Sequence, residues 1–434
     1  MTAPLLQRVR GTLPVFSWGL FDFSNTIFTV NVLNLYFYLW VIDDNSAPDI
    51  VFTLAFSSAM LAVALVSPML GAVSDRYGRR IPFLIVFTLV CVASTAAIGR
   101  VGGLPVALLL FAIAIFTYQS GNVYYDSLLA TVSHTGNRGR VSALGSALGN
   151  VGNIAGAVMV ADFVAGGGRG AAFLPTAVLF LFFALPCFLF VREVPNRVPW
   201  SFRLVKEGYG QLFSTLRNAR RHRDVLRFIG ARFLYGNSTN TLFVVMAVYV
   251  TKVIGFSDQQ VNLPDSLAGM VESLNIHSEV QLLIIIATVF GVLSAFIWGW
   301  LADRIGARKT LIMALILWAL VFVGVAATFH QAYFWPLGAL AGVALAGTGT
   351  TERAFLLRLI PPERAGEFFG LYAMVGRSAA VVGPLVWGGT LLLLEDLGLV
   401  SYRIAILALL VSVVLGFLVL LSVRERQPEA VAAE

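Results

Sequence analysis

Apolar stretches separated by short polar segments run along the whole chain. A helix of about 20 apolar residues crosses the roughly 30 Å hydrocarbon core of a bilayer. This criterion predicts twelve spanning helices, at 14–40, 50–74, 81–99, 104–130, 140–165, 171–191, 225–254, 279–302, 309–328, 333–358, 366–392 and 400–422. We therefore expect an all-α membrane protein with six helices on each side of a polar stretch at 192–224.

One polar segment occurs twice. Its first copy is Gly71-Ala-Val-Ser-Asp75-Arg76-Tyr-Gly78-Arg79-Arg80, and its second is Gly299-Trp-Leu-Ala-Asp303-Arg304-Ile-Gly306-Ala-Arg308-Lys309. Each copy closes an apolar stretch, and such a repeat indicates a transporter built from two pseudo-symmetric halves. We predict an N-terminal six-helix bundle at 1–191, a linker at 192–224 and a C-terminal six-helix bundle at 225–434.

Two of the polar segments have an amphipathic pattern. In 192–224 the apolar residues share one helical face and basic residues occupy the other, which predicts a helix on the cytoplasmic membrane surface. A regulatory partner site in this linker is the alternative. Segment 255–278 has a similar pattern and is expected to form a short amphipathic helix on the outer side.

Composition and charge agree with a membrane protein. The chain is 58% apolar and only 12% charged, with a mean hydropathy of +0.83, too little charge to cover a water-soluble surface. Of its 30 basic residues, 23 fall on the side of the N-terminus, only Arg100, Arg169, Lys252 and Arg403 on the other, and the remaining three within spans. Basic residues collect in the cytoplasm, so both termini are expected there. This topology explains the net charge of +7 without a nucleic-acid partner.

Several function classes lack their sequence signals. No Gly-x-x-x-x-Gly-Lys-Ser/Thr loop occurs, and the four histidines are far apart, so a transport ATPase or a metal-dependent membrane enzyme is disfavoured. Both cysteines, Cys91 and Cys187, fall within expected spans. We expect no enzymatic activity, metal or cofactor. Residues 1–13 show no cleavable signal, so the first span is expected to stay as an anchor.

The repeated segment is a candidate gate. An aspartate at a helix end can face the exposed N–H groups of a neighbouring helix, in a contact that parts when the cytoplasmic side opens. The candidate gating residues are Gly71, Asp75, Arg76, Gly78, Arg79, Arg80, Asp303, Arg304 and Arg308. The alternative is a purely topogenic role, which would not require glycines and aspartates at fixed spacing.

The same motif, between the second and third helices of each half, resembles the signature of the major facilitator superfamily. Within it the chain is most similar to the vacuole effluxer-like family, whose fungal members are autophagy-related amino-acid exporters. The segments that carry this resemblance are Ser17–Asn25, Arg138–Gly145 and Leu359–Tyr372. The chain departs from the family at Thr350-Thr351-Glu352-Arg353-Ala354, where small polar residues around a Ser-Arg-Ser are expected. The resemblance implies a fold of two six-helix bundles with the first, fourth, seventh and tenth helices lining a central cavity.

The first of these helices carries a carboxylate within the membrane. Asp22, Asn25, Thr26 and Thr29 share one face at 100° per residue. Asp22 is the leading proton-coupling candidate, because a carboxylate in a partly dry cavity holds a proton more readily than one in water. A structural acid bonded to a neighbouring helix is the alternative. Asn25 and Thr29 are substrate-binding candidates.

Helix 104–130 presents a second polar face. Its substrate-binding candidates are Tyr118, Gln119, Asn122 and Tyr125, whose amides and hydroxyls suit a small polar solute. Asp126 lies closer to the cytoplasmic end, as a proton-coupling residue or a member of a gate ion pair.

The second half has a cationic wall. In helix 225–254, Arg232 lies as deep as Asp22 does in the first helix, with Tyr235 and Thr239 on its face. Such a cavity would suit a zwitterion, or an anion moved with a proton; a direct bridge from Asp22 to Arg232 is the alternative.

Two further charges fall within the last helices. Glu352 and its neighbour Arg353 point about 100° apart, so only one can face the cavity. We favour Glu352, for substrate and for protons. Arg377 lies near mid-membrane and is expected to hold a carboxylate, from Glu352, Asp22 or the substrate.

Together these features predict a secondary active transporter of a small polar or charged solute, amino-acid-like, coupled to H⁺. Alternatives are a sugar or organic-anion symporter driven by Na⁺ or H⁺, and a non-transporting or lipid-handling protein of the same fold. We expect a monomer in the cell inner membrane, since the arginine-rich, alanine-rich composition is typical of a GC-rich bacterium.

Overall fold

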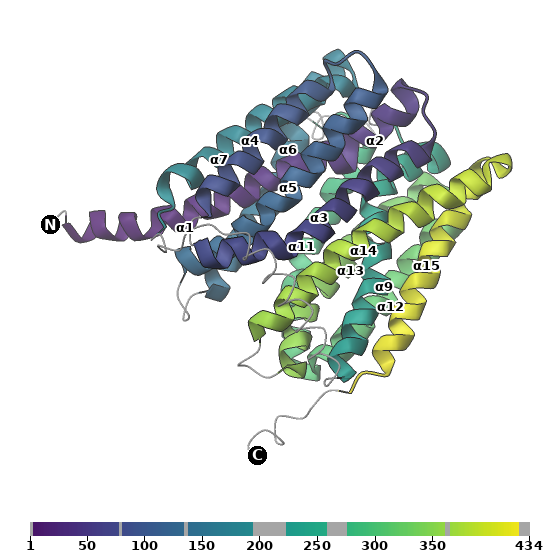
Figure 1. The fold of residues 1–434 in the computed structure, drawn as a ribbon. Coiled ribbons are helices and arrows are strands. Elements are labelled where there is room, and N and C mark those ends of the chain that lie inside the picture. The colour runs from purple at the N-terminus through teal and green to yellow at the C-terminus, as the bar shows by residue number, and fades with distance from the viewer. Residues whose placement is uncertain are drawn as a thin grey trace, which may run out of the picture. The chain divides into compact units, whose positions relative to one another are not determined.

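The computed structural model describes residues 3–77, 80–133, 138–193, 223–257, 276–360 and 365–424. Nearly all of these residues are helical, and none of them forms a strand. The chain divides into two compact units, Met1–Tyr209 with Ser257–Leu282, and Gly210–Phe256 with Leu283–Glu434. Each unit is a bundle of long helices (Figure 1).

The first unit contains six long helical stretches. The first of them, α1 (Ala3–Phe28), continues through the π-helical turns η1 (Thr29–Tyr36) and η2 (Trp40–Asp44) on either side of α2 (Phe37–Leu39). The others are α3 (Asp49–Tyr77), α4 (Ile81–Ile98), α5 (Leu104–Val132), α6 (Arg138–Gly167) and α7 (Phe173–Phe190), the last preceded by η3 (Arg169–Ala172).

The second unit repeats this plan. Its helices are α9 (Arg223–Tyr249), which ends in the π-helical η4 (Val250–Ile254), α11 (Glu279–Ile305), α12 (Ala307–Ala327), α13 (Gln331–Leu359), α14 (Ala365–Leu393) and α15 (Leu399–Leu421), with a short η6 (Glu395–Leu397). The first four residues of α11 belong to the first unit.

Helix pairing follows one pattern in both units. In the first, α1 packs against α6 and α7, and α4 packs against α5 and α7. In the second, α9 packs against α14 and α15, and α12 packs against α13 and α15. The repeated sequence motif is thus accompanied by a repeated arrangement of helices.

The twelve long helical stretches are consistent with the twelve expected spans, and the bounds agree closely for all but the first, which is helical from Ala3 to Asp44. Ten stretches of the described chain are long and apolar enough to cross a membrane. The other two, α9 and α13, contain Arg232 in one and Glu352 with Arg353 in the other, and such charges lower their hydropathy. Uncharged polar residues and glycines of the same two helices lower it further, so the charges are only part of the reason that these helices are less apolar than the other ten.

Glycines bring α1 and α6 close together. A Cβ added at Gly145, Gly149, Gly152 or Gly156 would collide with α1, for example 2.8 Å from the Cα of Ile27 at Gly156. Close approach lets side chains reach backbone across the interface: Thr26 donates to the carbonyl of Gly149 at 2.7 Å and Asn31 to that of Gly156 at 3.0 Å. The small residues of α6 thus serve close helix packing.

An arginine joins two helix ends in the first unit. Arg169, in the turn before α7, forms ion pairs with Asp43, at 3.1 Å, and with Asp44 at the end of η2. The charge distribution predicts that Arg169 lies in an outer loop. The predicted linker helix and the core of the predicted outer helix, at 194–222 and 258–275, lie outside the described residues.

Candidate functional site

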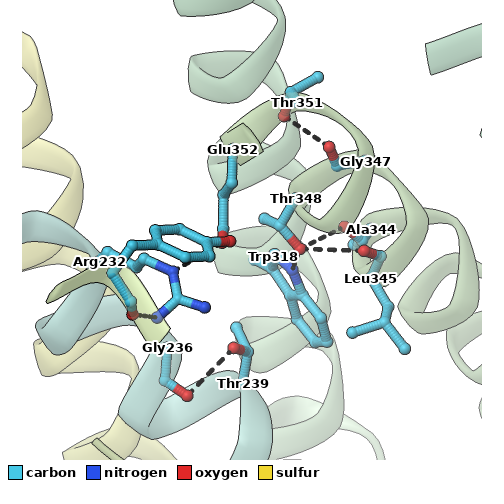
Figure 2. Close-up of polar contacts among 11 residues, drawn as sticks. Arg232, Gly236, Thr239, Trp318, Ala344, Leu345, Gly347, Thr348, Thr351 and Glu352 are labelled. Carbon is cyan, nitrogen blue, oxygen red and sulfur yellow. Dashed lines mark hydrogen bonds and ion pairs between the residues drawn. The ribbon is translucent and has the colours of Figure 1, made fainter. Parts of the chain in front are cut away.

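A buried ion pair joins α9 and α13 in the second unit. Nε of Arg232 donates to Oε2 of Glu352 at 2.9 Å, and the two side chains are only 17% and 10% exposed. Figure 2 shows the two side chains meeting from their separate helices. A charge within a membrane helix is costly unless it is paired, so each residue stabilises the charge of the other.

Tyr372, on α14, contacts both members of the pair. Its hydroxyl donates to Oε2 of Glu352 at 2.5 Å, and its ring centroid lies 3.7 Å from the guanidinium carbon of Arg232. Nη1 of Arg232 also donates to the Tyr372 carbonyl at 3.2 Å. The cluster formed by Arg232, Glu352 and Tyr372 therefore combines a charge pair, a cation–π contact and two further hydrogen bonds.

A glycine makes room for this cluster. A Cβ added at Gly376 of α14 would lie 2.5 Å from Nη1 and 3.0 Å from Nη2 of Arg232. The bare backbone of α14 thus lets the guanidinium group lie directly against the helix.

Three further polar residues of these helices are also buried. Tyr235 is fully buried, and Thr239 and Thr348 are nearly so. Both threonine hydroxyls donate to carbonyls of their own helices, at Gly236 and at Ala344, and Trp318 donates to Thr348 at 3.5 Å (Figure 2). Their hydroxyls are therefore engaged locally.

Amide and hydroxyl pairs join α1 and α5 in the first unit. Nδ2 of Asn25 donates to Oδ1 of Asn122 at 2.9 Å, and the hydroxyls of Thr29 and Tyr118 are 2.9 Å apart. Oδ1 of Asn25 is buried without a hydrogen-bond partner among the described residues. This set is uncharged and can both donate and accept hydrogen bonds.

Asp22 and Thr26 point to another neighbour. Where Asn25 and Thr29 face α5, Thr26 bonds to α6, and a Cβ at Gly149 of α6 would lie 2.7 Å from Oδ2 of Asp22. The single polar face expected of this helix is therefore shared between two helices, and Asp22 lies against α6.

Asp22 and Arg232 occupy corresponding places in the two units. Each is a charged residue on the first helix of its unit, and each lies against a glycine of the fifth helix, Gly149 or Gly376. These glycines also correspond in the repeat when Gly139 is matched to Gly366. The two units thus carry opposite charges at equivalent positions.

The remaining candidates differ in how far they are buried. Tyr125 is buried with its ring stacked on Trp18 and Phe21, each centroid 4.9 Å away, and its hydroxyl makes no hydrogen bond to the described residues. Gln119 and Arg377 are half-buried, and Asp126 is exposed. Arg353 is also exposed, which leaves Glu352 as the buried member of the adjacent pair.

The second copy of the repeated motif joins α11 to α12. Gly306, between them, has a φ of +96°, a conformation that favours glycine. Asp303 and Arg304 are exposed, with Arg304 4.8 Å from the Trp300 ring centroid, and Arg308 donates to the carbonyl of Leu421 at 2.8 Å. Arg308 thereby caps the end of α15.

Part of the first copy is described. Gly71, Asp75 and Arg76 lie in α3, and the side chains from 71 to 79, with the backbone of Gly78 and Arg79, lie outside the described residues. The backbone N–H groups of Arg80 and Ile81 donate to Oε2 of Glu193, at 2.7 and 2.8 Å. Glu193 thereby caps the start of α4, a contact that the sequence did not suggest.

Tyr372 is the main site residue that sequence reasoning missed. It is part of the segment that carries the family resemblance, but its partners are 140 and 20 residues away in the chain. A tyrosine near the start of a membrane helix is the only local signal. No group of three or more potential metal ligands occurs among the described residues.

Nearly the whole chain matches one protein family. A profile of the Vacuole effluxer Atg22 like family matches residues 29–431. The chain belongs to this family. The resemblance inferred from its motifs is confirmed.

Relatives of this Atg22-like protein agree. It is 25% identical over 427 residues to YxiO of Bacillus subtilis (strain 168), an uncharacterized MFS-type transporter, with 92% of this chain and 94% of that one covered. It is 26% identical over 323 residues to Autophagy-related protein 22-1 of Penicillium rubens, which covers 68% of this chain but 50% of the fungal one. The Atg22-like chain thus spans half the length of that fungal relative.

Solved structures show the same fold. A mutant of the nucleoside transporter NupG superposes with a TM-score of 0.74 at 13% identity, covering 95% of this chain and all of that one. A bacterial homolog of the human lysosomal transporter Spinster, inward-facing and unoccupied, gives 0.67 at 15% identity, with 96% and 98% covered. The predicted all-α major facilitator fold is confirmed, and the Atg22-like protein is a multi-pass membrane transporter of this superfamily.

Proposed function

We propose that this transporter moves a small polar or charged organic solute, amino-acid-like, by alternating access, and that it couples this movement to protons. The observation that carries the proposal is the buried ion pair of Arg232 and Glu352 inside membrane helices. Buried intramembrane charges are expensive and are kept chiefly where they bind a substrate, move a proton or hold a gate.

Polar groups of both units support a zwitterionic or anionic solute. The second unit offers a guanidinium group, which suits a carboxylate. The first unit offers the carboxyl group of Asp22 and the amide and hydroxyl pairs of Asn25 with Asn122 and Thr29 with Tyr118. Taken separately, each set matches a group that an amino acid carries.

A neutral polar solute is the second candidate. The paired amides and hydroxyls of the first unit are uncharged, and such groups bind sugars and nucleosides through hydrogen bonds. Among the structural neighbours, NupG is a nucleoside transporter, although this likeness extends to the fold alone.

Uptake into proteoliposomes tests the proposal. The purified protein is reconstituted, and labelled amino acids, organic acids, nucleosides and sugars are supplied with and without an imposed pH gradient. We expect an amino acid or organic acid to accumulate with the gradient and to stop accumulating when a protonophore collapses it. Accumulation that depends on Na⁺ alone would reject proton coupling, and failure of the whole panel to move would reject the proposed function.

Two variants identify the coupling residue. Asp22→Asn and Glu352→Gln remove the two candidate proton sites in turn, and a coupling variant loses accumulation against a gradient but keeps exchange of labelled for unlabelled solute. Asp126→Asn changes the exposed third candidate and Arg353→Gln serves as the exposed control. If every variant still concentrates the solute, proton coupling resides elsewhere.

A further inference from the structure

Arg232 uses only part of its hydrogen-bonding capacity. A guanidinium group has five N–H donors, and a carboxylate is bound most strongly by two of them in parallel. Of these five donors, Glu352 accepts only the one on Nε, and the Tyr372 carbonyl accepts one from Nη1. Nη2 makes no hydrogen bond to the described residues, and it lies beside the bare backbone of Gly376 on α14.

Glu352 is held by two donors on one oxygen. Its Oε2 accepts from Arg232 and from the hydroxyl of Tyr372. The cluster is neutral when Glu352 is ionised, with one positive and one negative charge. Any added anion would leave it with a net negative charge in surroundings where an uncompensated charge is costly.

We propose that Nη2 of Arg232, the donor group without a described partner, binds a carboxylate group of the transported solute, and that Glu352 takes up one proton as this carboxylate binds. This inference rests on the proposed function and assigns its anion site and its proton site. The proton passes from water to a carboxyl oxygen of Glu352, and no covalent bond to the solute forms or breaks.

The linkage follows from repulsion between like charges. A solute carboxylate at Nη2 and the carboxylate of Glu352 would share one guanidinium group within a few ångströms. Two carboxylates at such a distance do not both remain ionised without a large cost, so one of them retains a proton. Glu352 is the better acceptor, because a glutamate carboxylate is ordinarily more basic than the α-carboxylate of an amino acid.

Tyr372 is a positioning residue for this exchange. Its ring lies over the guanidinium group, which keeps the group in place when its bond to Glu352 weakens. Its hydroxyl can donate to an ionised Glu352 and accept from a protonated one. Gly376 leaves the backbone of α14 bare beside Nη1 and Nη2, and a side chain there would crowd the group that receives the solute.

Few other titratable groups face the pair. The groups that act electrostatically on Arg232 are Glu352, Tyr372 and Tyr235. Helix α15 also packs on α9, but its Tyr402 contacts Trp387 and its Arg403 donates to carbonyls at the end of α12. Arg353 of α13 is exposed. Glu352 is therefore the carboxyl group of this cluster that can exchange a proton.

Calorimetric titration tests the proposal on the full-length protein in detergent. The probes are L-alanine, L-leucine, L-glutamate and succinate, each compared with its amide, with adenosine and glucose as neutral solutes. Titration in two buffers of different ionisation enthalpy gives the number of protons taken up per ligand. For wild type we expect binding of a carboxylate but not of its amide, with uptake of about one proton and a Kd that rises about tenfold per pH unit through the range of uptake.

The variants separate the two parts of the inference. Glu352→Gln should bind the same carboxylate with no proton uptake and a flat pH profile, and Arg232→Gln should lose binding by about tenfold or more. Tyr372→Phe, which keeps the ring, should retain proton uptake, and Arg353→Gln should resemble wild type. If Arg232→Gln fails to fold, Glu352→Gln alone still decides whether Glu352 takes up the proton.

Other results would overturn the inference. Carboxylate binding without proton uptake in wild type, or uptake that persists in Glu352→Gln, rejects Glu352 as the proton site. Binding of adenosine or glucose with no carboxylate bound rejects the anion site while leaving the protein a transporter. Failure of every carboxylate to bind also rejects the anion site, and transport is then decided by the proteoliposome panel.

Discussion

Arg232 and Glu352 each depend on the other for stability. Replacing Arg232 by Gln leaves Glu352 buried opposite an uncharged partner, and breaking a buried pair in this way costs about 3 kcal/mol. We expect Arg232→Gln to unfold at a markedly lower temperature than wild type in detergent. The double variant Arg232→Gln/Glu352→Gln should recover much of this loss, because no charge is then left unpaired.

Arg353, the exposed neighbour of Glu352, provides the control for this double-mutant cycle. Arg353→Gln also removes a positive charge, but from an exposed position on α13 next to Glu352, so its unfolding temperature should stay close to that of wild type. A double variant as unstable as the sum of the two single variants would show that Arg232 and Glu352 do not interact.

Asp22 is expected to behave differently from Glu352. It lies against Gly149, so Gly149→Ala would place a Cβ 2.7 Å from its Oδ2 and displace the carboxyl group. Because the end of a side chain can move aside, we expect a modest effect on stability. Solute uptake should fall as far as it depends on the position of Asp22. Comparison of solute uptake by Gly149→Ala and Asp22→Asn tests this, and normal uptake by Gly149→Ala would mean that the position of Asp22 does not matter.

At the scale of whole helices, backbone crossings limit substitution. A Cβ added at Gly342 of α13 would collide with the carbonyl group of Ala287 in α11, and backbone cannot move aside as a side chain can. Gly342→Ala should therefore destabilise the protein by about 1–3 kcal/mol or more. Gly349 lies on the same helix with nothing within 4 Å, so Gly349→Ala should be neutral or slightly stabilising. The unfolding temperatures of Gly342→Ala and Gly349→Ala are compared. Equal values would contradict the close contact of α13 with α11 at Gly342.

The helices could be predicted from sequence because bilayer thickness sets their length, and α4 begins and ends within one residue of the expected bounds. The side of a helix that carries its polar residues could also be predicted, as for Asn25 and Thr29. Which neighbour that side contacts could not, since α5 and α6 both lie against the polar face of α1. Tyr372 was missed for the same reason: periodicity gives direction, whereas partners depend on how distant helices pack.

At the scale of the whole molecule, the repeat has opposite charges at equivalent places, and this asymmetry argues for a division of roles. Asp22 in the first unit and Arg232 in the second both lie against a glycine of the fifth helix. In the second unit a carboxyl group, that of Glu352, is bonded directly to the arginine at 2.9 Å. In the proposal made above, Arg232 of the second unit binds the anion, and Asp22 of the first unit stays a separate candidate for proton coupling.

The distribution of basic residues predicts how the molecule crosses the membrane. Both native cysteines are fully buried and should react poorly with a membrane-impermeant maleimide. Cysteines placed at two exposed positions then report the two sides, Arg100→Cys between α4 and α5 and Ser422→Cys after α15. With 23 basic residues on the N-terminal side against 4 on the other, we expect Arg100→Cys to react in intact cells and Ser422→Cys only after permeabilisation. The reverse labelling would invert the topology and place the repeated motif, with Arg80 and Arg308, on the outer face, where the cytoplasmic gate assigned to it could not operate.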